Sequence, residues 1–397
     1  MARIVKQGNC TCPGGEKGAL KYVLTDDDTL TISGQGVLYS SGVDRRSSAP
    51  KTSILDSSDV HLSQFKDMDI ERVVIDEGVT ALQEFSLCGL PITEVVLPGT
   101  VTHIGHAVFM RCTRLKTVVL PGTMQRIEEH AFDGCESLST ETLALIGKYR
   151  DTPAVIGGLS FVLRPRLREA VMVRSKYPSP ATYFQEPYYE GDIVVPTTVM
   201  HDGIEYTVTG ISHIEKYKCT SITLPATISF IDDAWISASV DFAPSNVRIA
   251  DVAAWCRVKL LKAECGYNYT EFPTRNRHLY LGDSSEPITE LVIPEGVTEI
   301  AHSVFNSCKD LRKVVLPQGL KKIGCWAFEG CSGLEIINIP DSVTEIGNGA
   351  FYGCTSLKLI QLPASLTSIE HDAFRECELL KKIGLIDKEG AEICSTK

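Results

Sequence analysis

A 23-residue pattern is repeated four times in succession between Ile288 and Leu380. The copies read ITELVIPEGVTEIAHSVFNSCKD, LRKVVLPQGLKKIGCWAFEGCSG, LEIINIPDSVTEIGNGAFYGCTS and LKLIQLPASLTSIEHDAFRECEL. A fixed period of this length indicates a solenoid, in which each copy forms one coil and stacks on its neighbours. We therefore expect an elongated array built from one coil repeated many times.

The residues that recur within the pattern define the expected coil. Numbered from its first apolar residue, each unit is apolar at positions 1, 4 and 6, which predicts a short strand with positions 4 and 6 facing the core. Position 7 is proline, which has no N–H to donate and therefore ends the ladder and turns the chain. Position 13 is isoleucine and position 18 phenylalanine, so we expect columns of stacked side chains, the aromatic one adding about 1 kcal/mol per pair. Six units follow the pattern well and begin at Ile92, Leu115, Ile288, Leu311, Leu334 and Leu357.

Four segments follow from where the pattern is present. Residues 1–68 are not repetitive, and Tyr22–Gly42 predicts a β-hairpin with a DDD turn and Thr29–Ser33 as its second strand, covering the open end of the array. The Ser-rich stretch up to Lys66 is predicted to be an exposed loop. Residues 69–140 form the first repeat block, which opens with a degenerate unit at Ile70.

The remaining two segments are 141–286 and 287–397. In the former the period is lost, and the sequence predicts a helix within Leu138–Arg150 and a hairpin within Gly158–Ser175. One degenerate unit near Ser221 retains a proline and an isoleucine, so we interpret 141–286 as a β-rich module between two blocks. Residues 287–397 hold the second repeat block and a tail that starts one more strand.

The repeat unit LxxVxLPxxVxxIxxxAFxxC resembles the leucine-rich repeat of the BspA-like family. The segments TLTISGQGVLYSSG, GDIVVPTTVMHDGIEYTVTGI and VRIADVAAWC followed by HLYL are similar to modules that accompany this repeat. The resemblance implies a repeat solenoid: a leucine-rich-repeat right-handed superhelix of 23-residue coils with a parallel β-sheet, interrupted by β-rich non-repeat modules.

The same resemblance implies a function. Members of this family are often surface or secreted proteins of gut and oral bacteria and of some parasitic protists, where they adhere to host matrix proteins or other cells or act in immune recognition. We therefore expect a non-enzymatic, monomeric interaction protein at the cell surface or outside the cell, with a protein or glycan ligand. The opening MARIVKQGNC has no apolar core typical of a signal peptide. An intracellular structural or scaffold protein is accordingly the alternative, unless a leader precedes this sequence.

Composition narrows the classes of partner. The formal net charge of −11 argues against nucleic acid and anionic membranes, because both bind basic patches. No apolar run approaches the ~18 residues of a membrane span. No paired carboxylates, activated nucleophile or metal-ligand spacing converges in the sequence, so we expect no catalytic, cofactor or metal site.

Cysteine and histidine are the residues that most invite a chemical role. Neighbouring cysteines at position 21 would lie about 5 Å apart, yet in a stacked ladder their side chains run parallel, so we expect buried thiols and no disulfides. Cys10 and Cys12 are predicted to be more exposed, with their pairing open. His103, His106 and His130 fall at positions 12, 15 and 16, where we expect solvent-facing loops. The position-21 residues are Cys112, Cys135, Cys308, Cys331, Cys354 and Cys377.

The outward face of the strand is the predicted partner-binding surface. Positions 3 and 5 point away from the core and vary between coils, and extended sheet surfaces are what solenoids use for binding. The alternative is that β-branched residues occur there because strands favour them. The aromatic segment Tyr177–Tyr189 is a second candidate, against the interpretation that it packs between the blocks. The candidate binding residues of the second block are Glu290, Val292, Lys313, Val315, Ile336, Asn338, Leu359 and Gln361.

Overall fold

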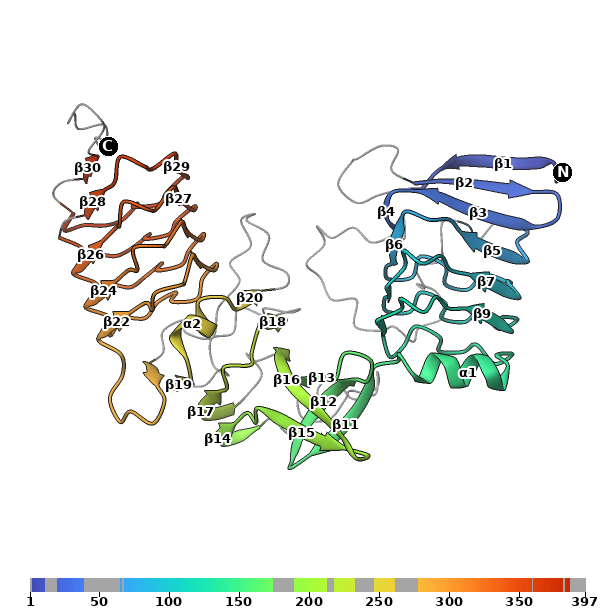
Figure 1. The fold of residues 1–397 in the computed structure, drawn as a ribbon, viewed down its shortest axis with the longest axis horizontal. Helices are drawn as coiled ribbons and strands as arrows, with labels where there is room; N and C mark the ends of the chain where they lie inside the picture. The colour runs from blue at the N-terminus through green and yellow to red at the C-terminus, as the bar shows by residue number, and fades with distance from the viewer. Residues whose placement is uncertain are drawn as a thin grey trace. The chain divides into compact units, whose positions relative to one another are not determined.

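The computed structural model describes residues 2–10, 20–38, 65, 68–173, 189–212, 218–232, 246–260, 278–358, 360–380 and 383–385. The chain divides into two compact units. The first is Met1–Pro153 with Val162–Glu169 and Pro178–Tyr183, and the second is Ala154–Phe161, Ala170–Tyr177 and Phe184–Lys397. Strands of successive coils stack in parallel within each unit, which confirms the predicted solenoid (Figure 1). The four segments drawn from the repeat pattern stay a prediction.

The first unit stacks two columns of strands. One sheet has the order β1 (Ile4–Asn9), β2 (Leu20–Thr25), β3 (Thr29–Gly34), β5 (Arg72–Ile75), β7 (Glu94–Val96) and β9 (Thr117–Val119). The other has the order β10 (Arg126–Ile127), β8 (His103–Ile104), β6 (Val79–Leu82) and β4 (Gly36–Leu38). Between the two columns lies a continuous core of Leu, Ile, Val, Met and Phe side chains.

The predicted hairpin at the start of this unit is confirmed. Strands β2 and β3 pair antiparallel around a turn in which Asp28 has a φ of 56°. Strand β3 then pairs in parallel with β5, so the hairpin stacks on the first coil and covers its apolar end. Phe65 corrects the prediction of an exposed loop up to Lys66, because it is fully buried and packs edge-on against Tyr22, with ring centroids 5.4 Å apart.

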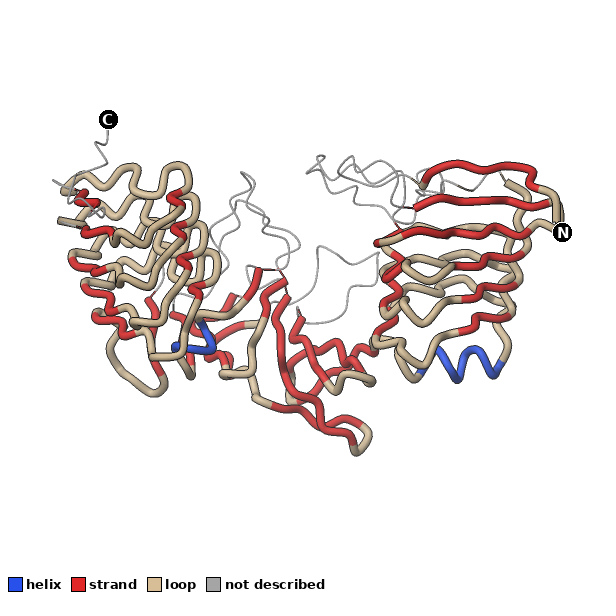
Figure 2. The backbone as a smooth tube through the Cα atoms, turned by 45° about the horizontal axis from the view of Figure 1, so that its top comes forward, coloured by secondary structure: helices blue, strands red, loops and turns tan. Residues whose placement is uncertain are grey.

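Two short helices occur in the described residues. The predicted helix is confirmed as α1 (Thr140–Gly147), whose N-cap Ser139 accepts a hydrogen bond from the Thr142 N–H. It lies at the end of the first unit opposite β1 (Figure 2). Helix α2 (Val252–Trp255) was not predicted; it begins at Asp251, whose carboxylate accepts from the Ala254 N–H at 2.6 Å. Neither of these helices is long and apolar enough to cross a membrane.

The segment in which the 23-residue period is lost nevertheless contains stacked strands. A four-stranded parallel sheet has the order β14 (Glu190–Val194), β17 (Lys218–Leu224), β19 (Asn246–Ile249) and β21 (His278–Leu281). A seven-stranded sheet has the order β11 (Thr152–Ile156), β12 (Leu159–Arg164), β13 (Glu169–Val173), β16 (Ile204–Ser212), β18 (Phe230–Asp232) and β20 (Lys259–Leu260), with β15 (Thr198–His201) paired to β16. The non-repetitive sequence therefore continues the parallel stacking of the solenoid.

The second block shows the coil in its most regular form. Its first column contains β22 (Glu290–Val292), β24 (Lys313–Val315) and β26 (Ile336–Asn338), followed by the pair β28 (Ile360–Leu362) and β30 (Ile383–Leu385). Its second column contains β23 (Glu299–Ile300), β25 (Lys322–Ile323), β27 (Glu345–Ile346) and β29 (Ser368–Ile369). Strands β22, β24 and β26 cover positions 3 to 5 and strand β28 covers positions 4 to 6, all inside the predicted span of 1 to 6. The second column, at positions 12 and 13, was not predicted.

The conserved geometry of the coil comes from its recurring residues. The carbonyl of each position-7 proline accepts from the N–H at position 10, as between Pro340 and Val343 at 3.0 Å, so the proline opens the expected turn. The position-18 phenylalanines stack as predicted, with ring centroids 5.3 Å apart for Phe305 and Phe328 and 5.4 Å for Phe328 and Phe351. The same stacking joins Phe109 to Phe132 in the first unit.

Candidate functional site

The outward face of the first strand column in the second block exposes aliphatic side chains. Val292, Val315 and Ile336 are 56%, 38% and 51% exposed, respectively. Val292 and Val315 are direct partners across β22 and β24, and Lys313 is the partner of Ile336 across β24 and β26. Their neighbours at positions 4 and 6, such as Val314 and Leu316, are buried as predicted. These side chains therefore form one apolar patch on three adjacent strands.

A groove of about 840 Å³ extends along this face. We call it the strand-face groove. Five of the residues predicted to bind a partner line it: Lys313, Val315, Ile336, Asn338 and Gln361. Glu290 and Val292 lie on the adjacent strand β22. Leu359 lies outside the described residues, so its place is not assigned. That these residues bind a partner stays a prediction.

The groove also has lining residues that were not predicted. Gln318, Asp341 and Ala364 all occupy position 8, directly after the position-7 proline, and Ser365 follows Ala364. They were not predicted because position 8 lies beyond the strand, after the proline. The proline turn brings position 8 beside the strand face, and the variability of this position from coil to coil was the available signal.

Charge is unevenly compensated along the groove. The Lys313 ammonium lies 2.6 Å from the Glu290 carboxylate, so its charge is neutralised by the preceding coil. Asp341 is exposed and forms no ion pair with any residue that the structure describes. The groove therefore presents one uncompensated negative charge beside an apolar patch.

Primary amides occupy the middle of the groove. Asn338 and Gln361 are exposed at position 5 of successive coils, where the earlier coils carry valine. Neither amide bonds to another side chain in the described part of the chain. A primary amide offers one acceptor oxygen and two N–H donors, so this pair can serve the peptide groups of an extended ligand.

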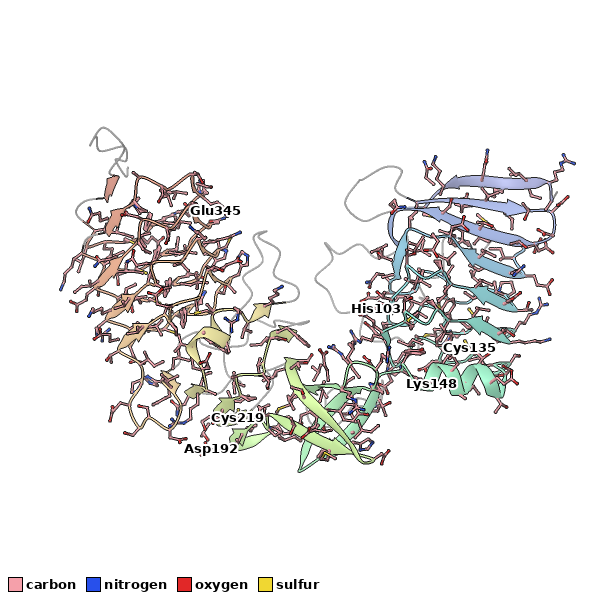
Figure 3. The ribbon with its side chains drawn as sticks, in the orientation of Figure 1. His103, Cys135, Lys148, Asp192, Cys219 and Glu345 are labelled. Atoms are coloured by element: carbon pink, nitrogen blue, oxygen red, sulfur yellow. The ribbon has the colours of Figure 1, made fainter. Side chains whose placement is uncertain are left out.

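The three histidines of the first unit are half-buried, which corrects the prediction that they face solvent. His106 and His130 lie in turns, as expected, whereas His103 lies in a strand. His103 lies in β8, half-buried, with its Nε2 3.2 Å from Glu128 Oε1 (Figure 3). His106 packs edge-on against Phe85 and His130, with centroids 5.8 and 5.3 Å away. The prediction was wrong because positions 12 to 16 belong to the second strand column and its following turn, where neighbouring coils cover each ring. Burial, and then the nearby charge of His130, lower the pKa of His106.

Two acidic residues beside these histidines, Glu128 and Asp151, are both paired with Arg126. Burial opposes the ionisation of Glu128, but the hydrogen bond with His103 and the charge of Arg126 hold its pKa at about 2. Asp151 is almost fully buried, and burial raises its pKa although Arg126 donates to it from Nε at 2.8 Å and Nη2 at 2.6 Å. Within the described residues, no group of three or more His, Cys, Asp or Glu could hold a metal ion. His103, Glu128, Arg126 and Asp151 are therefore joined by side-chain hydrogen bonds and ion pairs within and between successive coils.

The position-21 cysteines form a ladder of hydrogen-bonded thiols. In five of the six the S–H donates to a backbone carbonyl of the preceding coil, and in four of these five the carbonyl belongs to the position-18 phenylalanine. The pairs are Cys112 with Leu87 (3.2 Å), Cys135 with Phe109 (3.0 Å), Cys331 with Phe305 (3.1 Å), Cys354 with Phe328 (3.2 Å) and Cys377 with Phe351 (3.2 Å). Burial raises the pKa of Cys135 to about 12 and that of Cys377 to about 11. These thiols are structural donors, because their thiolates are disfavoured at neutral pH.

Cys10 corrects a prediction, whereas the structure describes only one residue of the aromatic segment. Cys10 was predicted to be exposed but is 6% exposed, because it lies at the end of β1 against the hairpin, where its N–H donates to the Leu20 carbonyl. Cys12 lies outside the described residues. Of the aromatic segment only Tyr189 is described, and it is buried, with its hydroxyl donating to the Val173 carbonyl at 3.0 Å and accepting from the Ser160 N–H at 2.7 Å. Tyr183, Phe184 and Tyr188 lie outside the described residues.

Comparison with known proteins places this architecture in context. The model of the BspA type leucine-rich repeat region matches residues 55–148 and 283–392 in six copies, just over half of the chain. A search of curated proteins finds no match.

Several solved structures align over most of the chain. A leucine-rich cell surface protein of Faecalibacterium prausnitzii is 19% identical, with 92% of this chain and 93% of that protein covered and a TM-score of 0.29. A leucine-rich repeat protein of Bacteroides ovatus is 17% identical, with 97% and 93% covered and a TM-score of 0.30. The pneumococcal vaccine antigen PcpA is 12% identical, with 97% and 89% covered and a TM-score of 0.30.

Proposed function

Because the chain belongs to the BspA type leucine-rich repeat family, we propose that it is a non-enzymatic binding protein of a bacterial surface that holds a protein ligand in its strand-face groove. The observation that carries this proposal is the groove itself, which places exposed aliphatic side chains from adjacent coils along one concavity. Exposed apolar side chains that gather in one place and are bordered by polar residues are typical of interaction sites.

The composition of the groove favours a protein over a glycan. Among the residues that the structure describes, none that lines the groove is aromatic, so a sugar ring would find no flat apolar surface to stack on. Aliphatic side chains together with amides suit a polypeptide, which offers both apolar side chains and backbone hydrogen-bonding groups. We propose host matrix proteins as the first class to test, since surface proteins of this kind meet them outside the cell.

Stability alone does not account for the exposed aliphatic residues. Positions 3 and 5 alternate with the buried position 4, and their side chains contribute little to the core. On the same strands and on the next coil, positions 3 and 5 also hold Glu290, Lys313, Asn338 and Gln361 without loss of the coil geometry. The fold thus tolerates polar residues there, and the aliphatic cluster is available for a role in binding.

The experiment measures binding of the purified full chain to a panel of extracellular matrix proteins and to a glycan array. We expect binding to at least one matrix protein, and at least tenfold weaker binding for the double variant Val315→Glu with Ile336→Glu, because two carboxylates would have to be desolvated against the ligand. The matched control is Val119→Glu with Thr117→Glu, which changes positions 5 and 3 on exposed strand β9 of the first unit.

Three results would refute the proposal. The first is a groove variant that binds as well as the unchanged chain. The second is an equal loss in the control, which would show that the effect is not specific to the groove. The third is binding to glycans alone. Circular dichroism of each variant establishes that it keeps its β structure before binding is compared.

A further inference from the structure

We infer that the ligand of the strand-face groove is an extended peptide segment in which an aliphatic side chain and a basic side chain lie on the same face, two or four residues apart. This inference rests on the proposed function and specifies the chemistry of the ligand. Three features of the groove carry it: the apolar patch, the amides beside it and the uncompensated carboxylate of Asp341.

The apolar patch selects the aliphatic side chain. Val315 and Ile336 are exposed on neighbouring strands as diagonal neighbours, because Val315 is in register with Asn338 and Ile336 with Lys313. Diagonal neighbours in a sheet lie about 7 to 8 Å apart. A branched side chain of Val, Ile or Leu can bridge that distance and contact both. An aromatic ring would contact only these two aliphatic side chains, because the described residues that line the groove include no aromatic ring for it to stack on.

The charges select the basic side chain. An acidic ligand group would have to compete with Glu290 for Lys313, since the two are already joined at 2.6 Å. Asp341 has no such partner in the described part of the chain, and it lines the same groove. A Lys or Arg side chain on the ligand would supply the missing cation, and at this exposed position the pair is worth roughly a two- to fivefold gain in affinity.

The order of these features along one coil sets the spacing. Ile336, Asn338 and Asp341 follow one another from the strand into the proline turn. An extended chain advances about 3.3 Å per residue and places alternate side chains on one face. If the aliphatic residue of the ligand is at position i, the basic residue is therefore at i+2 or i+4. The amides of Asn338 and Gln361 contact the ligand backbone between them.

The test is selection of a random twelve-residue peptide library on the immobilised full chain. We expect the enriched peptides to carry Val, Ile or Leu two or four residues from Lys or Arg. Selection on Asp341→Lys should instead enrich Asp or Glu at that spacing, and a basic peptide selected on the unchanged chain should bind this variant roughly four- to twentyfold more weakly, because the attraction is lost and a repulsion of similar size replaces it. The control Glu378→Lys makes the same charge change at an exposed residue that does not line the groove, and its selected peptides should match those of the unchanged chain.

The outcomes separate this inference from the proposed function. The inference is overturned if no peptide is enriched, if the enriched peptides show no basic residue at the expected spacing, or if Asp341→Lys selects the same peptides as the unchanged chain. In the last two cases the groove remains the binding site if Val315→Glu with Ile336→Glu abolishes binding of the selected peptides. If that double variant retains the peptides, the proposed function fails as well.

Discussion

Replacing Phe328 with alanine tests whether the aromatic column holds the coils together. Phe328 is fully buried and stacks on both sides, with ring centroids 5.3 Å from Phe305 and 5.4 Å from Phe351. The interplanar angles of 14° and 2° show that the three rings are nearly parallel. Truncation therefore removes a core side chain and two ring contacts at once.

The expected cost follows from these contacts. A buried Phe→Ala change costs about 3 to 5 kcal/mol, and each aromatic pair contributes roughly 0.5 to 1.5 kcal/mol beyond burial. We expect Phe328→Ala to lie at the upper end of that range, because coils above and below both lose a partner. Phe374→Ala is the matched control: Phe374 is only half-buried and stacks on Phe351 at 5.4 Å, and Phe351 is its one aromatic partner among the described residues. We expect it to cost about half as much.

Urea unfolding of the two variants beside the unchanged chain measures both costs. In a stacked array the stability depends on contacts between neighbouring coils, so the loss should also appear in hydrogen exchange of the Phe305 and Phe328 amides, which bond to Ala327 and Ala350 in the next coil. Equal losses for the two variants, or a loss below about 1 kcal/mol for Phe328→Ala, would refute the view that the column couples adjacent coils.

Two further predictions concern the buried polar groups. Cys331 and Cys354 are fully buried, and burial raises the pKa of both thiols. Iodoacetamide should therefore alkylate them only in urea, as detected by mass spectrometry. Rapid alkylation of the native chain would contradict a buried row of thiols. The pKa of Glu128 is about 2 in the folded chain against an ordinary value of 4.5, so its stabilisation is present above pH about 4.5 and is lost as the pH falls towards 2, a difference of up to about 3 kcal/mol. The stability of Glu128→Gln should accordingly fall less steeply over that pH range in urea unfolding, and parallel curves for the two proteins would show that the carboxylate is not stabilised by His103 and Arg126.

The repeat pattern was sufficient to predict the coil but not all of its contacts. Pro340, Phe328 and Ile323 occupy the roles expected from their positions, because proline chemistry and apolar periodicity act locally. The second strand column was missed because only two residues of each coil pair there, too few to show alternation. The thiol donors were missed for a similar reason: a buried cysteine reads as a small apolar residue, and its acceptor lies in another coil.

In the segment between the regular blocks, the strands stack as in a solenoid although the sequence has no 23-residue repeat. Ile222, Val247 and Leu279 are in register across β17, β19 and β21, and all are buried. The residues in register are 25 and then 32 positions apart, so no single period connects them. Parallel pairing constrains the strands and their inward side chains, while the connecting loops vary in length. Self-similarity at a fixed spacing therefore underestimates the number of stacked coils.

Within each coil of the second block, some positions stabilise the stack and others face the strand-face groove. Positions 4, 6, 13, 18 and 21 face the core or bond to the preceding coil, so a substitution at one of them disturbs the packing of the adjacent coils. Positions 3, 5 and 8 face the groove and hold residues as different as Lys313, Ile336 and Asp341 on the same backbone geometry. Because the core residues hold the coils in place, each groove position can change its chemistry without moving the others. If the strand-face groove binds the ligand as proposed, affinity can then be altered one coil at a time, and the outward residues of successive coils together determine which ligand binds.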